Sequence, residues 1–99
     1  MAKYKIDFTD EAKIDFSFFS AFECKMMLDQ IKCQLSWEPL TETRNRKRLR
    51  ESSIAPWELR VGKYRVFYEV FEDSLTVSVV AIGYKQHNIL YIRNKEMKL

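Results

Sequence analysis

The sequence predicts an α+β domain spanning residues 1–99, in which a two-helix antiparallel hairpin packs on one face of a curved, mostly antiparallel four-stranded sheet. Three observations predict this class. The N-terminal residues alternate between apolar and polar, as a strand does. The next segment, to residue 35, carries apolar residues at helical spacing, and residues 57–82 alternate again in three stretches. The expected element order is β-α-α-β-β-β.

The first strand and first helix follow from the N-terminal residues. Tyr4, Ile6 and Phe8 alternate with charged residues, which indicates a strand with one buried face. Thr9 can cap a helix, because its hydroxyl can accept a hydrogen bond from a backbone amide in the first turn. We expect that helix to run to about Phe19.

A second helix restarts at Ser20, three residues before Glu23, which is the spacing of a capping box. Cys33 lies nine residues after Cys24, about half a turn away around the helix, so the two thiols cannot pair within it and are expected to be reduced. The apolar stripe expected to face the core, with Cys24 buried in it, is Cys24, Leu28, Ile31 and Leu35.

Three strands are expected in the second half, over residues 57–61, 64–70 and 75–82. Gly62 and Lys63 fit a two-residue hairpin turn between the first two. Residues 36–55 show no period and are expected to form a long connection, of the kind that is often functional. The tail after Gly83 fits either a short helix near residues 87–92 or a turn at residues 93–95.

Composition narrows the class of function. Residues 1–40 hold five Lys and Arg against seven Asp and Glu, whereas residues 41–99 hold twelve against seven, so the positive charge lies in the second part. This asymmetry suggests an anionic partner. No apolar run has the length of a membrane span, and the N-terminus does not resemble a signal peptide, so a cytoplasmic protein without membrane contact is expected. Two cysteines and one histidine show no metal-ligand spacing, so no metal site is expected.

The hairpin turn sets two arginines side by side. If Val61 pairs with Tyr64, then Arg60 lies opposite Arg65 on the outer face of the sheet, with Glu58 on the same face. One interpretation is a solvated, salt-bridged face in which nearby glutamates offset the repulsion. The other is an anion site, because two fixed guanidiniums suit the geometry of a phosphate.

Two further features of the sequence favour nucleic acid as the anion. A basic segment in the long connection would attract a polyanion, although such charge runs are commonly only solvated. Phe67, on the same outer face as Arg65, could stack on a base, or instead cover the sheet or meet a protein. The expected RNA-binding residues of the basic segment are Arg44, Arg46, Lys47, Arg48 and Arg50.

The run W-E-L-R-V-G-K-Y-R-V-F-Y-E-V, followed by V-S-V-V-A-I-G-Y-K and then by Tyr91, resembles the RelE/ParE superfamily of bacterial toxins of type II toxin–antitoxin systems. The likeness is specific over about residues 55–85, and the expected element order is also that of the RelE-like microbial RNase fold. The resemblance implies a toxin that a cognate antitoxin binds and silences, in a hetero-oligomeric complex. RelE-like members enter the ribosomal A site and cut mRNA without a cofactor, whereas ParE-like members poison DNA gyrase.

The resemblance also implies roles for individual residues. Arg65 matches the arginine that contacts the scissile phosphate, and Arg60 the arginine of the preceding strand. Lys85 matches a basic residue that assists the leaving group, and Tyr91 a tyrosine that helps to orient or activate the attacking 2′-hydroxyl. The lysine pair that RelE carries before the hairpin turn is replaced here by Pro56 and Glu58.

Other nucleases of the superfamily transfer protons with a glutamate and a histidine, and Glu58 and His87 are the candidates for these roles. The reaction would be attack of a ribose 2′-hydroxyl on the adjacent phosphate, with Glu58 or Tyr91 as base and Lys85 or His87 as acid. His87 could serve in either role, because an imidazole gains and loses its proton near neutral pH. We therefore expect a metal-independent, ribosome-dependent mRNA endonuclease that inhibits translation. The alternatives are a gyrase-poisoning toxin and an inactive binding module of the same fold.

Overall fold

A computed structural model describes residues 2–97 and confirms the α+β class, with two helices and a mostly antiparallel sheet. Within those residues, no helix combines the length and the apolar character needed to cross a membrane. The elements in chain order are β1 (Lys5–Phe8), α1 (Asp10–Phe16), α2 (Ala21–Leu35), β2 (Arg46–Arg48), β3 (Trp57–Val61), β4 (Tyr64–Phe71), β5 (Thr76–Gln86), β6 (Ile89–Ile92) and β7 (Lys95–Met97).

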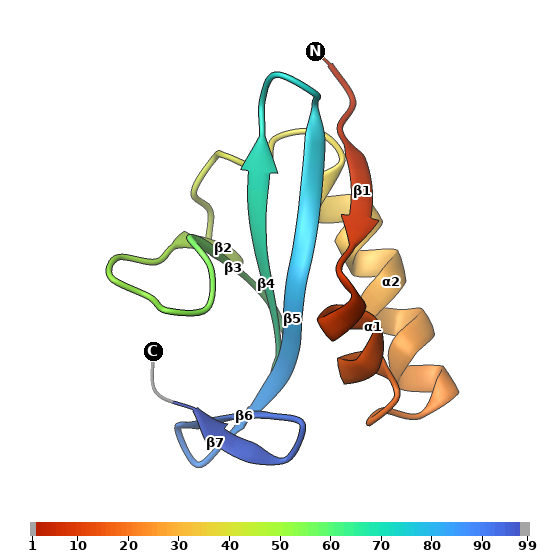
Figure 1. Cartoon of the computed structure of the whole chain (residues 1–99), viewed down its shortest axis with the longest axis vertical. Helices are drawn as coiled ribbons and strands as arrows, with labels where there is room; N and C mark the ends of the chain where they lie inside the picture. The colour runs from red at the N-terminus through yellow and green to blue at the C-terminus, as the bar shows by residue number, and fades with distance from the viewer. Residues whose placement is uncertain (1, 98–99) are drawn as a thin grey trace.

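The sheet has seven strands, whereas the sequence predicted four. Its path runs β2-β3-β4-β5-β6-β7, and β1 pairs in parallel with the first part of β5. Strand β2 lies in the connection for which the sequence predicted no strand. It has only three residues, which are too few to show the alternation of apolar and polar residues that marks a strand. Figure 1 shows the long β5 (light blue) running between β1 and β4 towards the C-terminal hairpin of β6 and β7.

The C-terminal tail forms a hairpin, so the alternative of a helix near residues 87–92 is wrong and the alternative of a turn is confirmed. Arg93 and Asn94 form that turn, with φ angles of 52° and 61°. Asparagine enters this left-handed region more readily than most residues, and paired positive φ angles match the right-handed twist of a hairpin.

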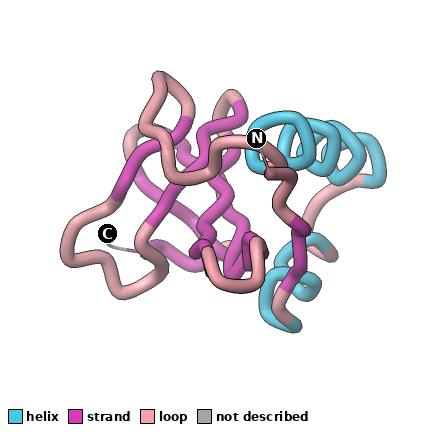
Figure 2. Tube along the Cα trace, turned by 90° about the horizontal axis from the view of Figure 1, so that it is seen from above, coloured by secondary structure: helices cyan, strands magenta, loops and turns pink. Residues whose placement is uncertain are grey.

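Both helices begin where the sequence predicted. The Thr9 hydroxyl accepts a hydrogen bond from the Ala12 amide, and Ser20 and Glu23 form the complete capping box. Helix α1 ends at Phe16, three residues earlier than expected. Figure 2 shows both helices grouped on one side of the strands.

The main core lies between the helices and the inner face of the sheet. Ile31 and Leu35 are fully buried as expected, but Met27 is the third fully buried residue of α2. Cys24 is only half-buried, so its expected place in the core is wrong; its Sγ lies 3.2 Å from the Phe16 carbonyl oxygen. Both Cys24 and Cys33 are free thiols.

A second apolar cluster covers much of the outer face of the sheet. Figure 1 shows the connection after β2 and the C-terminal hairpin on the side of the sheet away from the helices. A bulge makes this cluster possible, because Phe67 pairs with Ala81 while Tyr68 pairs with Val79. The extra residue turns Ala81 outward and Ile82 inward. The cluster's fully and nearly buried members are Ala55, Phe67, Ala81, Leu90 and Ile92.

Candidate nucleic-acid interface

The β3–β4 hairpin has the predicted register. Val61 pairs with Tyr64, and Arg60 lies directly opposite Arg65. The turn begins at Gly62, whose φ of 59° is a conformation that glycine adopts without a steric penalty. The geometry of this turn therefore fixes the two arginines as neighbours on the outer face.

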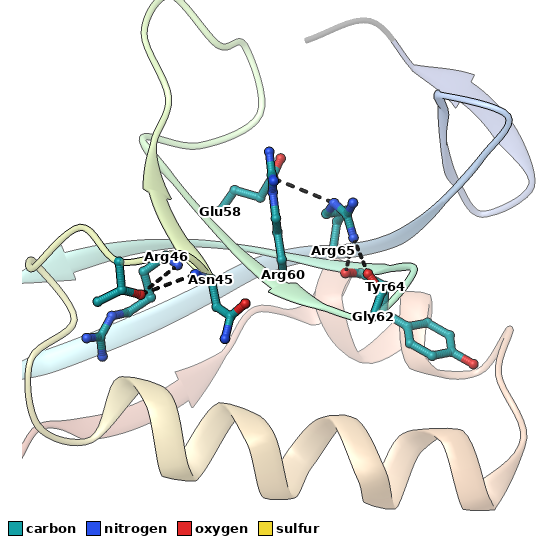
Figure 3. A network of polar contacts seen from close by, with 8 residues as sticks. Asn45, Arg46, Glu58, Arg60, Gly62, Tyr64 and Arg65 are labelled. Atoms are coloured by element: carbon teal, nitrogen blue, oxygen red, sulfur yellow. Dashed lines mark hydrogen bonds and ion pairs between the residues drawn. The ribbon is translucent and has the colours of Figure 1, made fainter.

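A buried carboxylate lies between the two guanidiniums. Glu58 Oε1 is 3.3 Å from Nε of Arg60 and 3.6 Å from Nε of Arg65, and the Glu58 side chain is only 2% exposed. Figure 3 shows the three side chains projecting from the same side of the sheet, with dashed lines joining their charged groups. The glutamate offsets the repulsion between like charges, and the trio keeps a net charge of about +1.

The two arginines differ in how freely they can meet a ligand. The Arg60 side chain is 40% exposed, but that of Arg65 is only 12% exposed. Arg65 Nη1 donates to the carbonyl oxygens of Gly62 (2.7 Å) and Tyr64 (2.9 Å). Its Nε is buried and has no hydrogen-bond acceptor among residues 2–97. Burial lowers the pKa of Arg65, while Glu58 opposes that change. Arg65 is thus a rigidly held cation, and Arg60 is the more accessible one.

The basic segment is divided between the two faces of the sheet. Arg46 is buried and donates to the carbonyl oxygen of Gln34, near the end of α2, and to that of Thr41 in the connection that follows, so the expectation that it binds RNA is wrong. Lys47 pairs with Glu58 and therefore shares the face of the arginine pair. A groove of about 480 Å³ lies beside β2, the strand that forms this edge of the sheet. Its lining residues are Glu42, Lys47, Arg48, Leu49 and Arg50, and Arg44 is also exposed.

Strand β5 places Lys85 beside the hairpin turn. The Lys85 amide donates to the Lys63 carbonyl oxygen at 2.8 Å. Lys85 pairs with Leu90, a member of the outer cluster, so its side chain belongs to the same face as Arg65. His87 is exposed in the turn between β5 and β6, with a φ of 54°. Lys85 is therefore the tail residue that the structure brings to the face of the arginine pair.

Tyr91 lies on the opposite face, which corrects the expectation that it joins Arg65. The register pairs Tyr64 with Tyr84 and Tyr84 with Tyr91, so the three tyrosines share one face. Figure 3 shows the Tyr64 ring pointing away from the guanidiniums, towards the helices. Tyr91 instead stacks on Tyr84, with ring centroids 5.4 Å apart.

Two other expected roles do not fit the burial of the residues concerned. Phe67 is fully buried in the outer cluster, so the interpretation that it stacks on a base is wrong and the alternative, that it covers the sheet, is confirmed. Glu58 is buried and ion-paired with both arginines, so it has no access to a substrate proton and is not the general base. Its position indicates instead that it orients the pair.

Sequence reasoning missed a buried carboxylate that closes a gap in the sheet. Between the stretches of β5 that pair with β1 and β6, the Ile82 amide donates to Asp15 Oδ2 at 2.9 Å. Arg93, in the turn of the C-terminal hairpin, places its Nε 3.2 Å from Asp15 Oδ1. Burial raises the pKa of Asp15, and Arg93 opposes that change. The sequence signal for this buried carboxylate was Asp15 itself, which lies between the apolar residues Ile14 and Phe16 in the short helix α1.

The arrangement can bind an anion but offers no ligand set for a metal. Arg60, Arg65, Lys47 and Lys85 present positive groups on one face, and guanidinium groups donate paired hydrogen bonds to phosphate oxygens. Residues 2–97 contain no group of three His, Cys, Asp or Glu side chains placed to hold a metal ion. The chemistry within reach is phosphate binding and stabilisation of negative charge.

Comparisons with known proteins agree with this fold. A family model described as the ParE toxin of type II toxin–antitoxin systems, parDE, matches residues 27–89. The structure is similar to the toxin–antitoxin complex RelBE2 from Mycobacterium tuberculosis, with a TM-score of 0.75 and 26% identity over 86% of this chain and 94% of that one. It also resembles the archaeal RelE–RelB complex from Pyrococcus horikoshii, with a TM-score of 0.67 and 16% identity over 88% and 99% of the chains. No curated protein matches significantly.

Proposed function

Because the chain belongs to the ParE toxin family of type II toxin–antitoxin systems, we propose that it is the toxin of such a system and acts as a ribosome-dependent mRNA endonuclease. The observation that carries this proposal is the pair Arg60 and Arg65, held side by side on one face of the sheet by Glu58. Two guanidiniums at fixed separation suit a phosphodiester and its more negatively charged transition state.

The proposed reaction is attack of a ribose 2′-hydroxyl on the adjacent phosphorus. The bond to the 5′-oxygen of the next nucleotide breaks, leaving a 2′,3′-cyclic phosphate and a 5′-hydroxyl. Arg60 and Arg65 stabilise the charge that develops on the phosphate oxygens. Lys85 protonates the leaving oxygen, and His87 accepts the 2′-hydroxyl proton. Glu58 acts as a positioning residue for the arginines.

The partners of the chain follow from the same proposal. The similar structures from M. tuberculosis and P. horikoshii are complexes of a toxin with its antitoxin. We propose that this chain likewise binds a cognate antitoxin, which covers the basic face with a helix or an acidic strand. Its targets would be the ribosome and mRNA, and cleavage would stop translation.

Gyrase poisoning is the second candidate, and two observations favour it. The matching family model is that of the ParE toxin, and the resemblance described above implies gyrase poisoning for ParE-like members. In addition, the helical side exposes large apolar residues, with Phe22 79% and Ile14 51% exposed. Such a surface suits a protein target and is not needed for phosphate chemistry.

Expression in bacteria separates these functions. For the nuclease, primer extension on a reporter mRNA should show cuts phased with codons in cells that make the wild-type chain. These cuts should vanish with Arg65→Ala and persist with the matched control Lys32→Ala, an exposed cation on α2 at the other side of the sheet. Induction of the DNA-damage response without mRNA cuts would assign the chain to the gyrase poisons. Absence of any toxicity would indicate a binding module that has lost the activity.

A further inference from the structure

We propose that Asp15 and Arg93 are positioning residues for the proposed cleavage. Their ion pair joins helix α1 to the turn between β6 and β7, and so holds the C-terminal hairpin against the end of β5. That hairpin supports the end of β5 and the turn after it, which carry Lys85 and His87. The inference rests on the proposed function, in which these two side chains transfer protons.

The carboxylate of Asp15 fills a place on the side of β5 away from β4 that no neighbouring strand reaches. Strand β1 pairs with β5 only as far as Val79, and β6 pairs with it only from Tyr84 onward. Between these stretches, the Ile82 amide donates to Asp15 Oδ2 at 2.9 Å. Extending the register of β5 and β6 puts Arg93 opposite Ile82, where the chain turns away into β7. Asp15 therefore takes the place of a strand at this point.

The second oxygen of the same carboxylate faces Arg93. The Asp15 side chain is only 1% exposed, and its Oδ1 accepts no hydrogen bond within residues 2–97. Arg93 Nε lies 3.2 Å from this oxygen. A buried carboxylate without a counter-charge is costly, so the structure favours the position of the turn that keeps the guanidinium there.

The other contacts of the C-terminal hairpin lie on different sides of it. Leu90 and Ile92 are buried in the outer apolar cluster, on the face away from the helices. Asn94 Oδ1 accepts a hydrogen bond of 3.3 Å from the Tyr84 hydroxyl at the exposed surface. The Asp15–Arg93 ion pair adds a buried polar contact to a helix, which fixes the C-terminal hairpin from the inner face as well.

The ion pair acts on the proposed acid and base through β6. Strand β5 extends beyond its last pair with β4, and there Lys85 pairs with Leu90 of β6. A shift of the C-terminal hairpin would therefore move Lys85 and His87, whereas Arg60 and Arg65 belong to the β3–β4 hairpin and would stay in place. A displacement of about 1 Å at a reacting group can slow a reaction about a hundredfold.

Cleavage kinetics on programmed ribosomes test this role. Asp15→Asn keeps an acceptor for the Ile82 amide but loses the charge that attracts Arg93, and Arg93→Gln removes the other partner. We expect each change to lower kcat about tenfold and to alter KM by less than about twofold, because the arginine pair still binds phosphate. Arg93→Lys keeps the cation and should recover most of the rate. The double variant should be no slower than either single variant, because both remove the same interaction.

Hydrogen–deuterium exchange measures the C-terminal hairpin independently of cleavage. In Arg93→Gln, the backbone amides of β6 should exchange about tenfold faster than in the wild type, while those of β4 should be unchanged. The matched control is Asn94→Gly, which removes the neighbouring turn side chain and keeps a residue that tolerates the φ of 61°. It should leave both kcat and the exchange of β6 unchanged. Faster exchange throughout Arg93→Gln would indicate general destabilisation and overturn the positioning role.

The two measurements separate this inference from the nuclease proposal. If the wild type cuts mRNA, unchanged kcat or unchanged β6 exchange in Asp15→Asn and Arg93→Gln would overturn the positioning role alone. A raised KM with unchanged kcat would also overturn it, because the loss would then lie in binding. If the wild type cuts no mRNA, the nuclease proposal and the catalytic use of the ion pair both fail. Faster β6 exchange in Arg93→Gln would still establish that the ion pair holds the C-terminal hairpin.

Discussion

Glu58 Oε1 lies 3.6 Å from Nε of Arg65, and both side chains are largely buried beside the more exposed Arg60. A carboxylate between two guanidiniums explains how like charges can face one another on adjacent strands. It also means that the positive charge of the arginine pair is only partly neutralised, since two cations share one fixed carboxylate.

The first prediction concerns the stability supplied by this carboxylate. Glu58→Gln leaves two guanidiniums facing each other without a counter-charge, so we expect the free energy of unfolding to fall by about 3 kcal/mol. Urea denaturation of the purified chain measures this change. The matched control is Glu69→Gln, on the outer face of β4, which should cost less than about 1 kcal/mol because the structure gives Glu69 no ion pair within residues 2–97. Equal losses for the two variants would contradict the bridging role.

The second prediction compares two glycines. A Cβ at Gly83 would lie 2.3 Å from the backbone oxygen of Tyr91, so Gly83→Ala must push β6 away from β5. We expect a loss of about 3 kcal/mol. Gly62→Ala meets no atom within 4 Å and pays only for its positive φ, about 1 kcal/mol. Chemical denaturation of both variants tests the order, and a larger loss at Gly62 would show that β6 does not pack on Gly83 as described.

The third prediction is a pH dependence that arises from Asp15. Burial raises the pKa of this carboxyl above its ordinary value of 3.8, so the folded state binds the proton more tightly than the unfolded state does. The contribution of Asp15 to stability is therefore fully present below about pH 3.8 and is lost as the pH rises through the folded-state pKa. Asp15→Asn removes this loss, so its stability relative to the wild type should increase with pH across that window.

Denaturation of the wild type and Asp15→Asn at a series of pH values checks the sign. Arg93→Gln supplies a second check, because Arg93 is the cation that opposes the raised pKa. Removing it should make the stability of the chain fall more steeply with pH. A difference between wild type and Asp15→Asn that is flat with pH would show that the carboxyl titrates alike in the folded and unfolded states.

Local chemistry made part of the fold predictable from sequence. The Gly62-Lys63 turn fixed the register of β3 and β4, and therefore the pairing of Arg60 with Arg65. The Ser20–Glu23 capping box fixed the start of α2. In each case a few adjacent residues determine the geometry, so no knowledge of the tertiary structure was needed.

Features that depend on distant residues were not predictable in the same way. Strand β2 is too short to show a period, and Arg46 is buried only because the end of α2 lies beneath it. The face of Tyr91 depends on the register of β5 with β6, which the two-residue turn at His87 and Asn88 sets. Asn88 is a residue type that favours positive φ in such a turn, whereas the resemblance to RelE-like toxins implied a catalytic place for Tyr91.

The most direct test of the central claim is cleavage by the purified chain of mRNA that carries a single 2′-deoxynucleotide at the cut site, on programmed ribosomes. If the arginine pair serves attack by the 2′-hydroxyl, the unmodified mRNA is cut to a fragment with a 5′-hydroxyl end, and the 2′-deoxy substrate is not cut there. Arg60→Ala and Arg65→Ala should each reduce the cutting of unmodified mRNA, because they remove a cation from the phosphate. Undiminished cutting of the 2′-deoxy substrate, or no cutting of any mRNA by the wild-type chain, would contradict the account.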